Sequence, residues 1–378
     1  MKQGWQKTTL GEAFTTVTGN TPPKNNPELF GNYIPLVKPP ELLDARVDSA
    51  EDGLSEAGSK VARITPSNSI LVSCIGNLGK IGLNTVPVAF NQQINAIVPD
   101  ETRAVPVFMF YQVLSCDFKD QLEALSSGTT VPIVNKSKFN SIEIVLPPLP
   151  EQKRIVAILG EAFASLATAK ANAEKNLQNA RALFESHLQS VFKKRGEGWV
   201  ESSLVACCEQ IFAGGDVPKD RLSKERTSQY SVPIYSNGEK DDGLYGFTDL
   251  ARVTRPSITV SARGTLGFTA IRTEPFLPVV RLIVLVPDEK QISLPFLYYA
   301  VVGMEFGNTG TSIPQLTVPN FKESKLHVPS LSEQRTIVEK LDALMEETQR
   351  LATIYKQKLT ALDALKQSLL HQAFTGEL

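Results

Sequence analysis

Residues 145–156 read VLPPLPEQKRIV, and residues 327–338 read HVPSLSEQRTIV. In each copy an apolar segment ends at a proline, and Glu-Gln and then Ile-Val follow it. Proline is favoured in the first turn of a helix and breaks a helix interior. No further proline occurs through residue 195 in the first copy or to the last residue in the second. The two stretches therefore predict two long helices, at residues 148–195 and 330–378, each following a globular unit.

The sequence repeats itself along most of its length, which predicts two related units at residues 1–147 and 196–329. The offset between matched positions falls from 194 to 182, so the first copy carries insertions. One chain with two such units has the parts of a homodimer, and this points to a two-fold ligand. The matched segments are GWQKTTL (4–10) and GWVESSL (198–204), GNTPPK (19–24) and GGDVPK (214–219), SILVSCIGNLGK (69–80) and SITVSARGTLGF (257–268), and SGTTVP (127–132) and TGTSIP (309–314).

Within each unit, short β-branched runs bounded by Gly, Pro and Asn predict strands. SILVSC (69–74) and NAIV (95–98) are typical strands, whereas residues 107–114 favour a helix. We therefore expect an α+β fold with a largely antiparallel sheet in each unit. The pattern does not predict the order of the strands.

The two long stretches have the apolar repeat of an antiparallel coiled coil with pseudo-two-fold symmetry. A 3-4 repeat in the second stretch, shifted by 182 positions, gives the matching positions of the first. The predicted contact positions are Leu341, Leu344, Thr348, Leu351, Tyr355, Lys358, Leu362, Leu365 and Leu369, with Leu159, Ala162, Leu166, Ala169, Ala173, Asn176, Ala180, Leu183 and His187 opposite.

Two polar residues, Asn176 and Lys358, interrupt this repeat near the middle of each helix. We interpret them as a pair that sets the register of the coiled coil, as a buried Asn does elsewhere. The alternative is that both side chains face solvent.

Composition gives a soluble globular profile with no membrane-spanning run, and the first residues lack the apolar core of a secretory signal, so we expect a cytoplasmic protein. The 39 basic and 40 acidic residues nearly cancel. Any DNA affinity must therefore come from a locally charged face or from a partner subunit. No C-x-x-C pair indicates zinc, and the three histidines are interpreted as structural, so no metal site is expected.

No phosphate-binding loop, nucleotide-binding glycine motif or nucleophile elbow is present, and no Asn-Pro-Pro-aromatic run indicates methyl transfer. One nuclease-like pattern occurs, Pro287-Asp288 followed by Glu323-Ser324-Lys325. The first copy has Pro99-Asp100 without the second half of that pattern. We therefore interpret Pro-Asp as the end of a strand and expect a non-catalytic protein.

The run SGTTVPIVNKSKFNSIEIVLPPLPEQKRIV (127–156), its second copy and the alternation of unit and helix resemble the specificity subunit of type I restriction-modification enzymes. The segments GGDVPK, PIYSNGEKDDGLYGFTD (233–249) and SARGTLGF also resemble target-recognition domains of that family. The resemblance implies that each unit reads one half of a split site on double-stranded DNA and that the helices set the spacer. It also implies partners: two modification (methyltransferase) subunits and restriction/translocase subunits. S-adenosylmethionine, ATP and Mg are then expected on the partners, with no cofactor in this chain.

Base reading requires side chains with paired hydrogen-bond donors and acceptors on segments that reach a groove. For each candidate the alternative is an exposed polar turn residue. The candidates are Lys24, Asn77, Lys80, Asn91 and Gln92 in the first unit, and Lys219, Ser236, Asn237, Lys240, Arg263 and Thr265 in the second. Because the two sets differ, we expect an asymmetric bipartite site. The rival function is a protein-binding scaffold with paired domains on a helical spacer.

Overall fold

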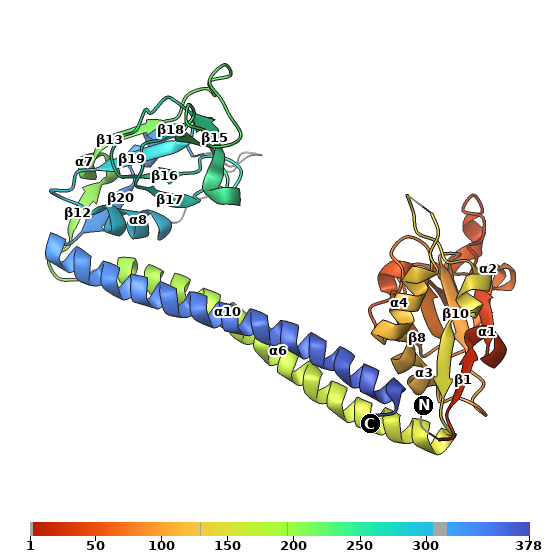
Figure 1. Ribbon diagram of the computed structural model, residues 1–378. Helices are drawn as coiled ribbons and strands as arrows, with labels where there is room; N and C mark the ends of the chain where they lie inside the picture. Colours follow the sequence, from red (N-terminus) through yellow and green to blue (C-terminus); the bar gives the residue numbers. More distant parts are fainter. Residues whose placement is uncertain (1–2, 129, 195, 305–315) are drawn as a thin grey trace. The chain divides into compact units, whose positions relative to one another are not determined.

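The computed structural model describes residues 3–128, 130–194, 196–304 and 316–378. Contacts divide the chain into two compact units (Figure 1). Unit 1 comprises Met1–Glu174 with Gln357–Leu378, and unit 2 comprises Lys175–Lys356. The predicted long helices are present as α6 (Leu149–Lys194) and α10 (Leu331–Thr375). The units divide these helices in the middle, so the four-part division made from the sequence remains a prediction.

Unit 1 is built on a five-stranded sheet, as expected for an α+β fold. The strand order is β2-β10-β7-β8-β4, and all neighbours are antiparallel except β4 and β8. The strands are β2 (Thr15–Thr18), β10 (Ile94–Val98), β7 (Ile70–Ser73), β8 (Ile81–Asn84) and β4 (Ala45–Val47).

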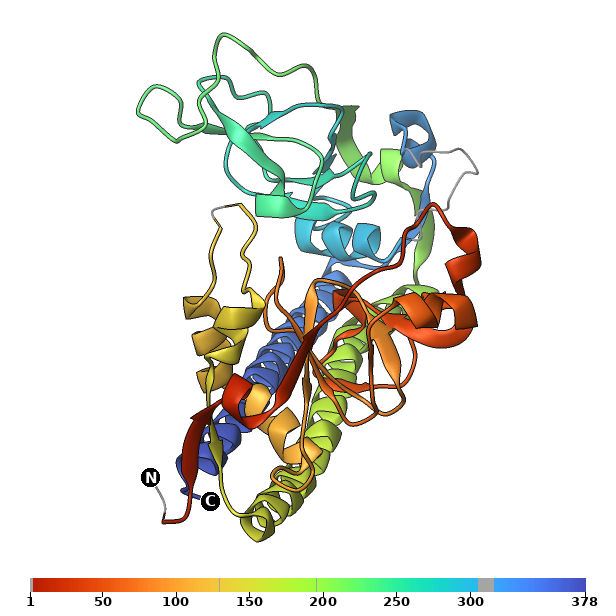
Figure 2. The ribbon, with the colours of Figure 1, turned by 90° about the vertical axis from the view of Figure 1, so that its right-hand side faces the viewer.

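Smaller elements complete unit 1. A second sheet has the order β5-β3-β9-β6, and β1 pairs with β11 (Figure 2). These strands are β5 (Gly53–Leu54), β3 (Phe30–Val37), β9 (Val88–Phe90), β6 (Ile64–Thr65), β1 (Gln6–Thr9) and β11 (Glu143–Leu146). The helices are α1 (Leu10–Ala13), α2 (Glu56–Val61), α3 (Pro106–Val113), α4 (Cys116–Ala124) and α5 (Lys136–Asn140), with 3₁₀ turns η1 (Pro27–Leu29) and η2 (Pro39–Glu41).

Unit 2 repeats this plan with fewer strands. Its main sheet has the order β13-β19-β16-β17, a second sheet has the order β15-β14-β18, and β12 pairs with β20. The strands are β13 (Cys208–Ala213), β19 (Ile283–Pro287), β16 (Ser257–Val260), β17 (Thr269–Arg272), β15 (Leu244–Thr248), β14 (Val232–Tyr235), β18 (Leu277–Pro278), β12 (Val200–Ser203) and β20 (Lys325–Val328). The helices are α7 (Leu204–Cys207), α8 (Leu294–Val302) and α9 (Val318–Lys322), with a 3₁₀ turn η3 (Lys240–Gly243).

In each unit a short apolar helix joins the sheet to the long helices. The α3 ring of Phe108 lies 5.3 Å from the α10 ring of Phe374, in one core with Ile155 and Leu159 of α6. In unit 2, Figure 1 shows α8 between the main sheet and α10. Burial of α3 and α8 on both sides explains why their sequences are apolar all round.

One glutamine fastens each long helix to its unit. Gln152 is fully buried; its Oε1 accepts from the Val105 amide (2.8 Å), and its Nε2 donates to the carbonyls of Arg103 (2.9 Å) and Pro147 (2.8 Å). The repeated Glu-Gln motif therefore encodes a junction between helix and unit.

Gln334 of unit 2 repeats these three bonds. Its side chain bonds the Ser293 amide (2.8 Å) and the carbonyls of Gln291 (2.9 Å) and Pro329 (3.0 Å).

The contact face of the helices differs from the strict 3-4 repeat. Leu183, His187 and Leu365 are exposed, whereas Phe184, Leu188 and Leu370 are half-buried or buried. Those three predicted contact positions are therefore wrong, and in α6 the contact is made one residue later, at Phe184 and Leu188. A helix with 3.6 residues per turn drifts away from a 3.5-residue repeat, and the contact face moves with it.

Asn176 and Lys358 are also exposed, which fits the solvent-facing interpretation and not a buried register pair. The two helices run antiparallel within unit 1, because Lys170 Nζ lies 3.0 Å from Asp363 Oδ1 whereas the earlier Arg154 Nη2 donates to the carbonyl of the later Leu378 (2.6 Å). By length and composition alone α6 could cross a membrane, because one 18-residue window has a mean hydropathy of 1.2.

The two units carry one ion pair with its charges exchanged. In unit 1, Lys7 of β1 pairs with Glu143 of β11 (2.7 Å). In unit 2, Glu201 of β12 pairs with Lys325 of β20 (2.6 Å). Both pairs lie diagonally across equivalent antiparallel ladders, so they occupy the same place in the repeat.

Candidate nucleic-acid interface

Three segments of unit 1 leave the same edge of its main sheet. β10 is antiparallel to β2 and β7, and it pairs Asn95 with Thr18 and Ile94 with Ser73. The ends of β2 and β7 therefore lie beside the start of β10. We call the segments at this edge, residues 19–24, 74–80 and 91–93, the unit 1 edge. They contain every DNA-binding candidate predicted in the first unit: Lys24, Asn77, Lys80, Asn91 and Gln92.

Hydrogen bonds hold the segments of the unit 1 edge together. The Gly19 amide donates to the Ile94 carbonyl (3.0 Å), and Thr21 Oγ1 donates to Gln92 Oε1 (3.0 Å). A Cβ on Gly19 would lie 2.2 Å from the Phe90 carbonyl oxygen, so only glycine permits this approach.

The predicted residues of unit 1 do not share one role. Asn91 is buried, and its Oδ1 accepts from the Gln93 amide (3.0 Å), so it shapes the turn. Lys24, Asn77 and Gln92 are exposed and can reach a ligand, and Lys80 is half-buried.

The SGTTVP signature supports the middle segment of this edge. The Gly76 amide donates to the Pro132 carbonyl (3.0 Å), and the Val134 amide donates to the Cys74 carbonyl (2.9 Å). Gly76 and Gly79 have φ of +77° and +71°, a conformation that glycine favours, so these glycines serve the turn geometry. The second copy, residues 309–314, lies outside the described residues.

Unit 2 builds the same edge from its main sheet. β19 pairs Ile283 with both Ala213 of β13 and Val260 of β16. Residues 214–219, 261–268 and 279–282 therefore leave together, and we call them the unit 2 edge. The Gly214 amide donates to the Leu282 carbonyl (2.8 Å), as Gly19 donates to Ile94 in unit 1.

The unit 2 edge is hollowed into a cavity of about 950 Å³. Lys219 and Arg263, both predicted from the sequence, line it together with Tyr245 and Arg281. Thr265 is exposed on the same segment as Arg263.

The other unit 2 candidates separate into different roles. Asn237 is structural, since its Oδ1 accepts from the Ala262 amide (2.7 Å) and its Nδ2 donates to the Val280 carbonyl (2.6 Å). The Ser236 amide donates to the Gly243 carbonyl (2.8 Å). Lys240 is exposed on η3, outside the three segments of the edge.

Sequence reasoning missed Arg281, although the repeat contained the signal. Residues 279–281 (VVR) occupy the place of residues 91–93 (NQQ), at the offset of 188 that aligns the preceding strands. The structure confirms this match, because the Leu282 amide bonds the Val279 carbonyl (3.1 Å) as the Ile94 amide bonds Asn91 (3.1 Å).

Both edges are positively charged within a nearly neutral chain. The unit 1 edge holds Lys24 and Lys80 and no acidic residue. The unit 2 edge holds Lys219, Arg263 and Arg281 against Asp216 alone. A net charge of +2 at each edge fits a locally charged face for a polyanion.

Two neighbouring arginines of unit 2 are neutralised instead. Arg221 pairs with Asp249, and this guanidinium lowers the pKa of the Asp249 carboxyl. Arg226 lies 3.1 Å from Glu274. These pairs pin the 220–231 segment to the second sheet, and we do not assign them to the candidate interface.

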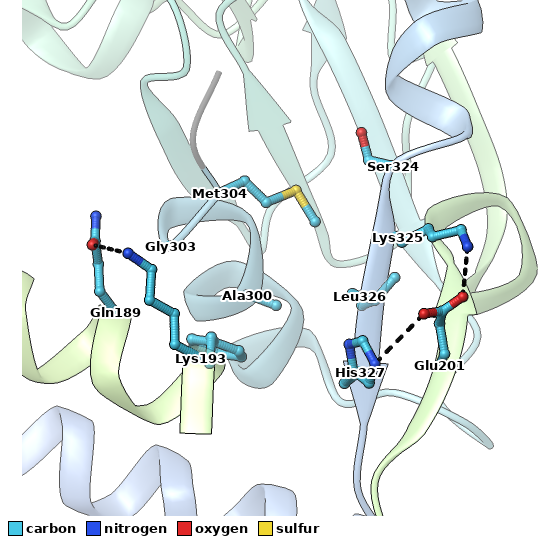
Figure 3. A pocket seen from close by; sticks show the side chains of 11 residues that line it. Gln189, Lys193, Glu201, Ala300, Gly303, Met304, Ser324, Lys325, Leu326 and His327 are labelled. Atoms are coloured by element: carbon cyan, nitrogen blue, oxygen red, sulfur yellow. Dashed lines mark hydrogen bonds and ion pairs between the residues drawn. The ribbon is translucent and has the colours of Figure 1, made fainter. Parts of the chain in front are cut away.

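A second cavity of unit 2, of about 560 Å³, lies at the junction of α6, α8, β12 and β20 (Figure 3). Glu201 joins Lys325 there and lies 3.7 Å from His327 Nε2, while Lys193 Nζ donates to Gln189 Oε1 (3.2 Å). No predicted DNA-binding residue lines this cavity, and we assign it to the junction.

The nuclease-like pattern has a structural explanation. Asp288 accepts from the Lys290 amide (3.1 Å) and from Gln291 Nε2 (2.8 Å), and these bonds lower the pKa of its carboxyl. Asp100 accepts from the Thr102 amide in the same way (3.0 Å). Pro-Asp therefore ends a strand and caps a turn in both units. Within residues 3–128, 130–194, 196–304 and 316–378, no group of three His, Cys, Asp or Glu side chains could hold a metal ion.

Comparison with known proteins gives one consistent result. The family model described as the type I restriction modification DNA specificity domain matches residues 2–177 and 197–361. A putative type I specificity subunit from Mycoplasma pneumoniae is 34% identical over 214 residues, which cover 56% of this chain and 58% of that protein. The chain thus spans somewhat more than half of that relative. The MjaVIII specificity subunit from Methanocaldococcus jannaschii is 22% identical, covering 100% of this chain and 93% of that protein.

Solved structures show the same fold. A structure titled as the basis of complex assembly and conformational transition of the type I R-M system matches with a TM-score of 0.86 at 20% identity, over 100% of this chain and 99% of that one. The HsdS subunit from Thermoanaerobacter tengcongensis matches with a TM-score of 0.63 at 21% identity, over 100% and 98%.

Proposed function

Because the chain belongs to the family of type I restriction-modification DNA specificity domains, we propose that it is the DNA-recognition subunit of such a complex. The unit 1 edge and the unit 2 edge each read one half of a split site on double-stranded DNA. One observation carries this proposal: the same three-segment, positively charged edge is built twice, on the same sheet positions, with different side chains.

The side chains at the two edges support reading over catalysis. Lysine, arginine and amide groups recognise phosphates and base edges. The described acids that could suggest a nuclease, Asp100 and Asp288, are occupied by turn hydrogen bonds. We therefore assign methyl transfer and cleavage to modification and restriction subunits, which would carry S-adenosylmethionine, ATP and Mg.

A randomised duplex library tests the recognition proposal. The full chain is assembled with its modification subunits and bound duplexes are selected and sequenced. An asymmetric two-part motif with a fixed gap is expected, because the two edges carry different residues. Enrichment of a palindrome, or of no motif, contradicts the proposal.

The long helices are proposed to set the gap and to dock the modification subunits. Seven residues added to both helices, after Glu174 and after Lys356, lengthen each by about 10 Å. At about 3.4 Å per base pair, the selected gap should grow by about three base pairs with both half-sites unchanged. A change in the half-sites themselves would contradict this division of roles.

A further inference from the structure

The turn that carries Arg281 has a backbone conformation that needs support. Val280 and Arg281 have φ of +53° and +62°, in the left-handed region that glycine favours. A β-branched residue is rarely found there. Non-glycine residues in such conformations concentrate at binding and catalytic sites, where the surrounding structure holds them.

Three contacts to its backbone, one of them from the Asn237 side chain, hold this turn. The Val280 amide donates to the Gly215 carbonyl (2.8 Å), and the Val280 carbonyl accepts from Asn237 Nδ2 (2.6 Å). Gly214 packs flat against the strand before the turn, since a Cβ there would lie 2.6 Å from the Pro278 carbonyl carbon. The turn is therefore rigidly placed by the segments on either side of it.

The Arg281 side chain is not used by the fold. It is exposed, it lines the 950 Å³ cavity, and it makes no hydrogen bond, ion pair or ring contact to any described residue. Arg221 and Arg226, in contrast, each have a carboxylate partner. A guanidinium presented by a fixed turn into an open cavity has all its donors available to a ligand.

We propose that Arg281 reads a guanine in the half-site recognised by unit 2. This inference rests on the proposed function and names a residue for it. The planar guanidinium donates two parallel hydrogen bonds to O6 and N7 of guanine, the commonest specific contact in the major groove. Such a contact requires a fixed approach, and the left-handed turn supplies it. Lys219, on the flanking segment, contacts the backbone phosphates as a point charge.

The test compares three variants of the full chain in complex with its modification subunits, each selected on the randomised duplex library. Arg281→Ala removes the guanidinium, and Arg281→Lys keeps the charge without the fork. Lys290→Ala is the matched control, since it removes an exposed cation beyond the opposite end of β19. Thermal melting of all three should match the parent chain, because both side chains are exposed.

Arg281→Ala should lose the preference for guanine at one base pair of one half-site, and Arg281→Lys should weaken it, because an ammonium group can reach O6 and N7 without the fixed geometry of the guanidinium. Binding to the parent site should fall about 10- to 100-fold, and the other half-site should remain. Lys290→Ala should enrich the parent motif. If Arg281→Ala weakens all duplexes equally and lowers the salt dependence by about one ion, Arg281 is a phosphate contact and the inference is wrong. An unchanged motif in both Arg281 variants also overturns it. If the parent chain itself enriches no two-part motif, the proposed function fails as well.

Discussion

The unit 1 edge and the unit 2 edge have the same backbone frame, but they differ in whether the side chains at the turn bond to other residues of the edge. In unit 1 the amide side chains are bonded within the edge, Asn91 to Gln93 and Gln92 to Thr21. In unit 2 the equivalent turn is apolar and left-handed and ends in an arginine without a partner among the described residues. The hydrogen bonds that both edges share, from Gly19 to Ile94 and from Gly214 to Leu282, run between backbone groups, so the side chains at the turn can change while the frame remains. Recognition and architecture are therefore separable in this fold.

The cysteines distinguish the units most sharply. Burial raises the pKa of Cys74 and of Cys208 to about 12, and it also raises the pKa of Cys207. At pH 8 a thiol with a pKa of about 12 is about one part in ten thousand thiolate, the reactive form. Cys116 of α4 is exposed. A thiol reagent at pH 8 should therefore label unit 1 at Cys116 alone, by peptide mapping, and all four cysteines in denaturant. Fast labelling of Cys207 or Cys208 in the native chain would contradict the burial of these two side chains.

The two glutamine junctions should be equally important. Gln152→Ala and Gln334→Ala each leave three buried or half-buried backbone groups without their side-chain partner, so each should lower the free energy of unfolding by about 2–4 kcal/mol. Gln178→Ala, on the exposed face of α6, is the matched control and should change it little. Chemical denaturation measures all three. A loss at only one junction would show that the units are not anchored alike.

The glycine that begins the first segment of each edge packs against backbone, and this packing is closer at Gly19 of unit 1 than at Gly214 of unit 2. Gly19→Ala places a Cβ 2.2 Å from two backbone carbonyl oxygens, whereas Gly214→Ala meets backbone at 2.6 Å. Both substitutions should lower the free energy of unfolding by about 1–3 kcal/mol, and Gly19→Ala should lower it more than Gly214→Ala. As a control, Gly160→Ala in α6 meets nothing closer than 3.8 Å and should stabilise slightly, since alanine favours helix. Equal, negligible effects at residues 19 and 214 would argue against the shared frame.

The two exchanged ion pairs, Lys7–Glu143 and Glu201–Lys325, should make the smallest contribution to the free energy of unfolding. All four side chains are more than half exposed, so each pair is worth about 0.2–1 kcal/mol. Lys7→Glu should destabilise unit 1 slightly, and Lys7→Glu with Glu143→Lys should recover the loss. A double-mutant cycle by denaturation measures the coupling energy, and added salt should reduce it. A coupling energy of zero at low salt would mean that this ion pair does not contribute to the stability of unit 1.

The sequence predicted the parts of the fold that depend on local patterns. Proline placement and the Glu-Gln motif located α6 and α10 to within a few residues, and the glycine-rich segments marked two of the three parts of each edge. The helix contact face was missed at Leu183 and His187 because a 3.5-residue template does not follow 3.6-residue geometry. The role of Asn237 was also out of reach, since its partners at residues 262 and 280 meet it only through sheet pairing. Arg281 could have been found by carrying the internal alignment through the Asn91–Gln92 position.

The exchanged ion pairs also disfavour the pairing of a strand of one unit with a strand of the other while the chain is being synthesised. β1 and β12 occupy the same place in the repeat, and so do β11 and β20, so each strand of one pair could meet the wrong strand of the other. A crossed pairing of β1 with β20 would set Lys7 against Lys325, and β12 with β11 would set Glu201 against Glu143. Tandem repeats misfold by such exchanges. Because the charges of the ion pair are exchanged between the units, only the pairing of β1 with β11 and of β12 with β20 brings opposite charges together.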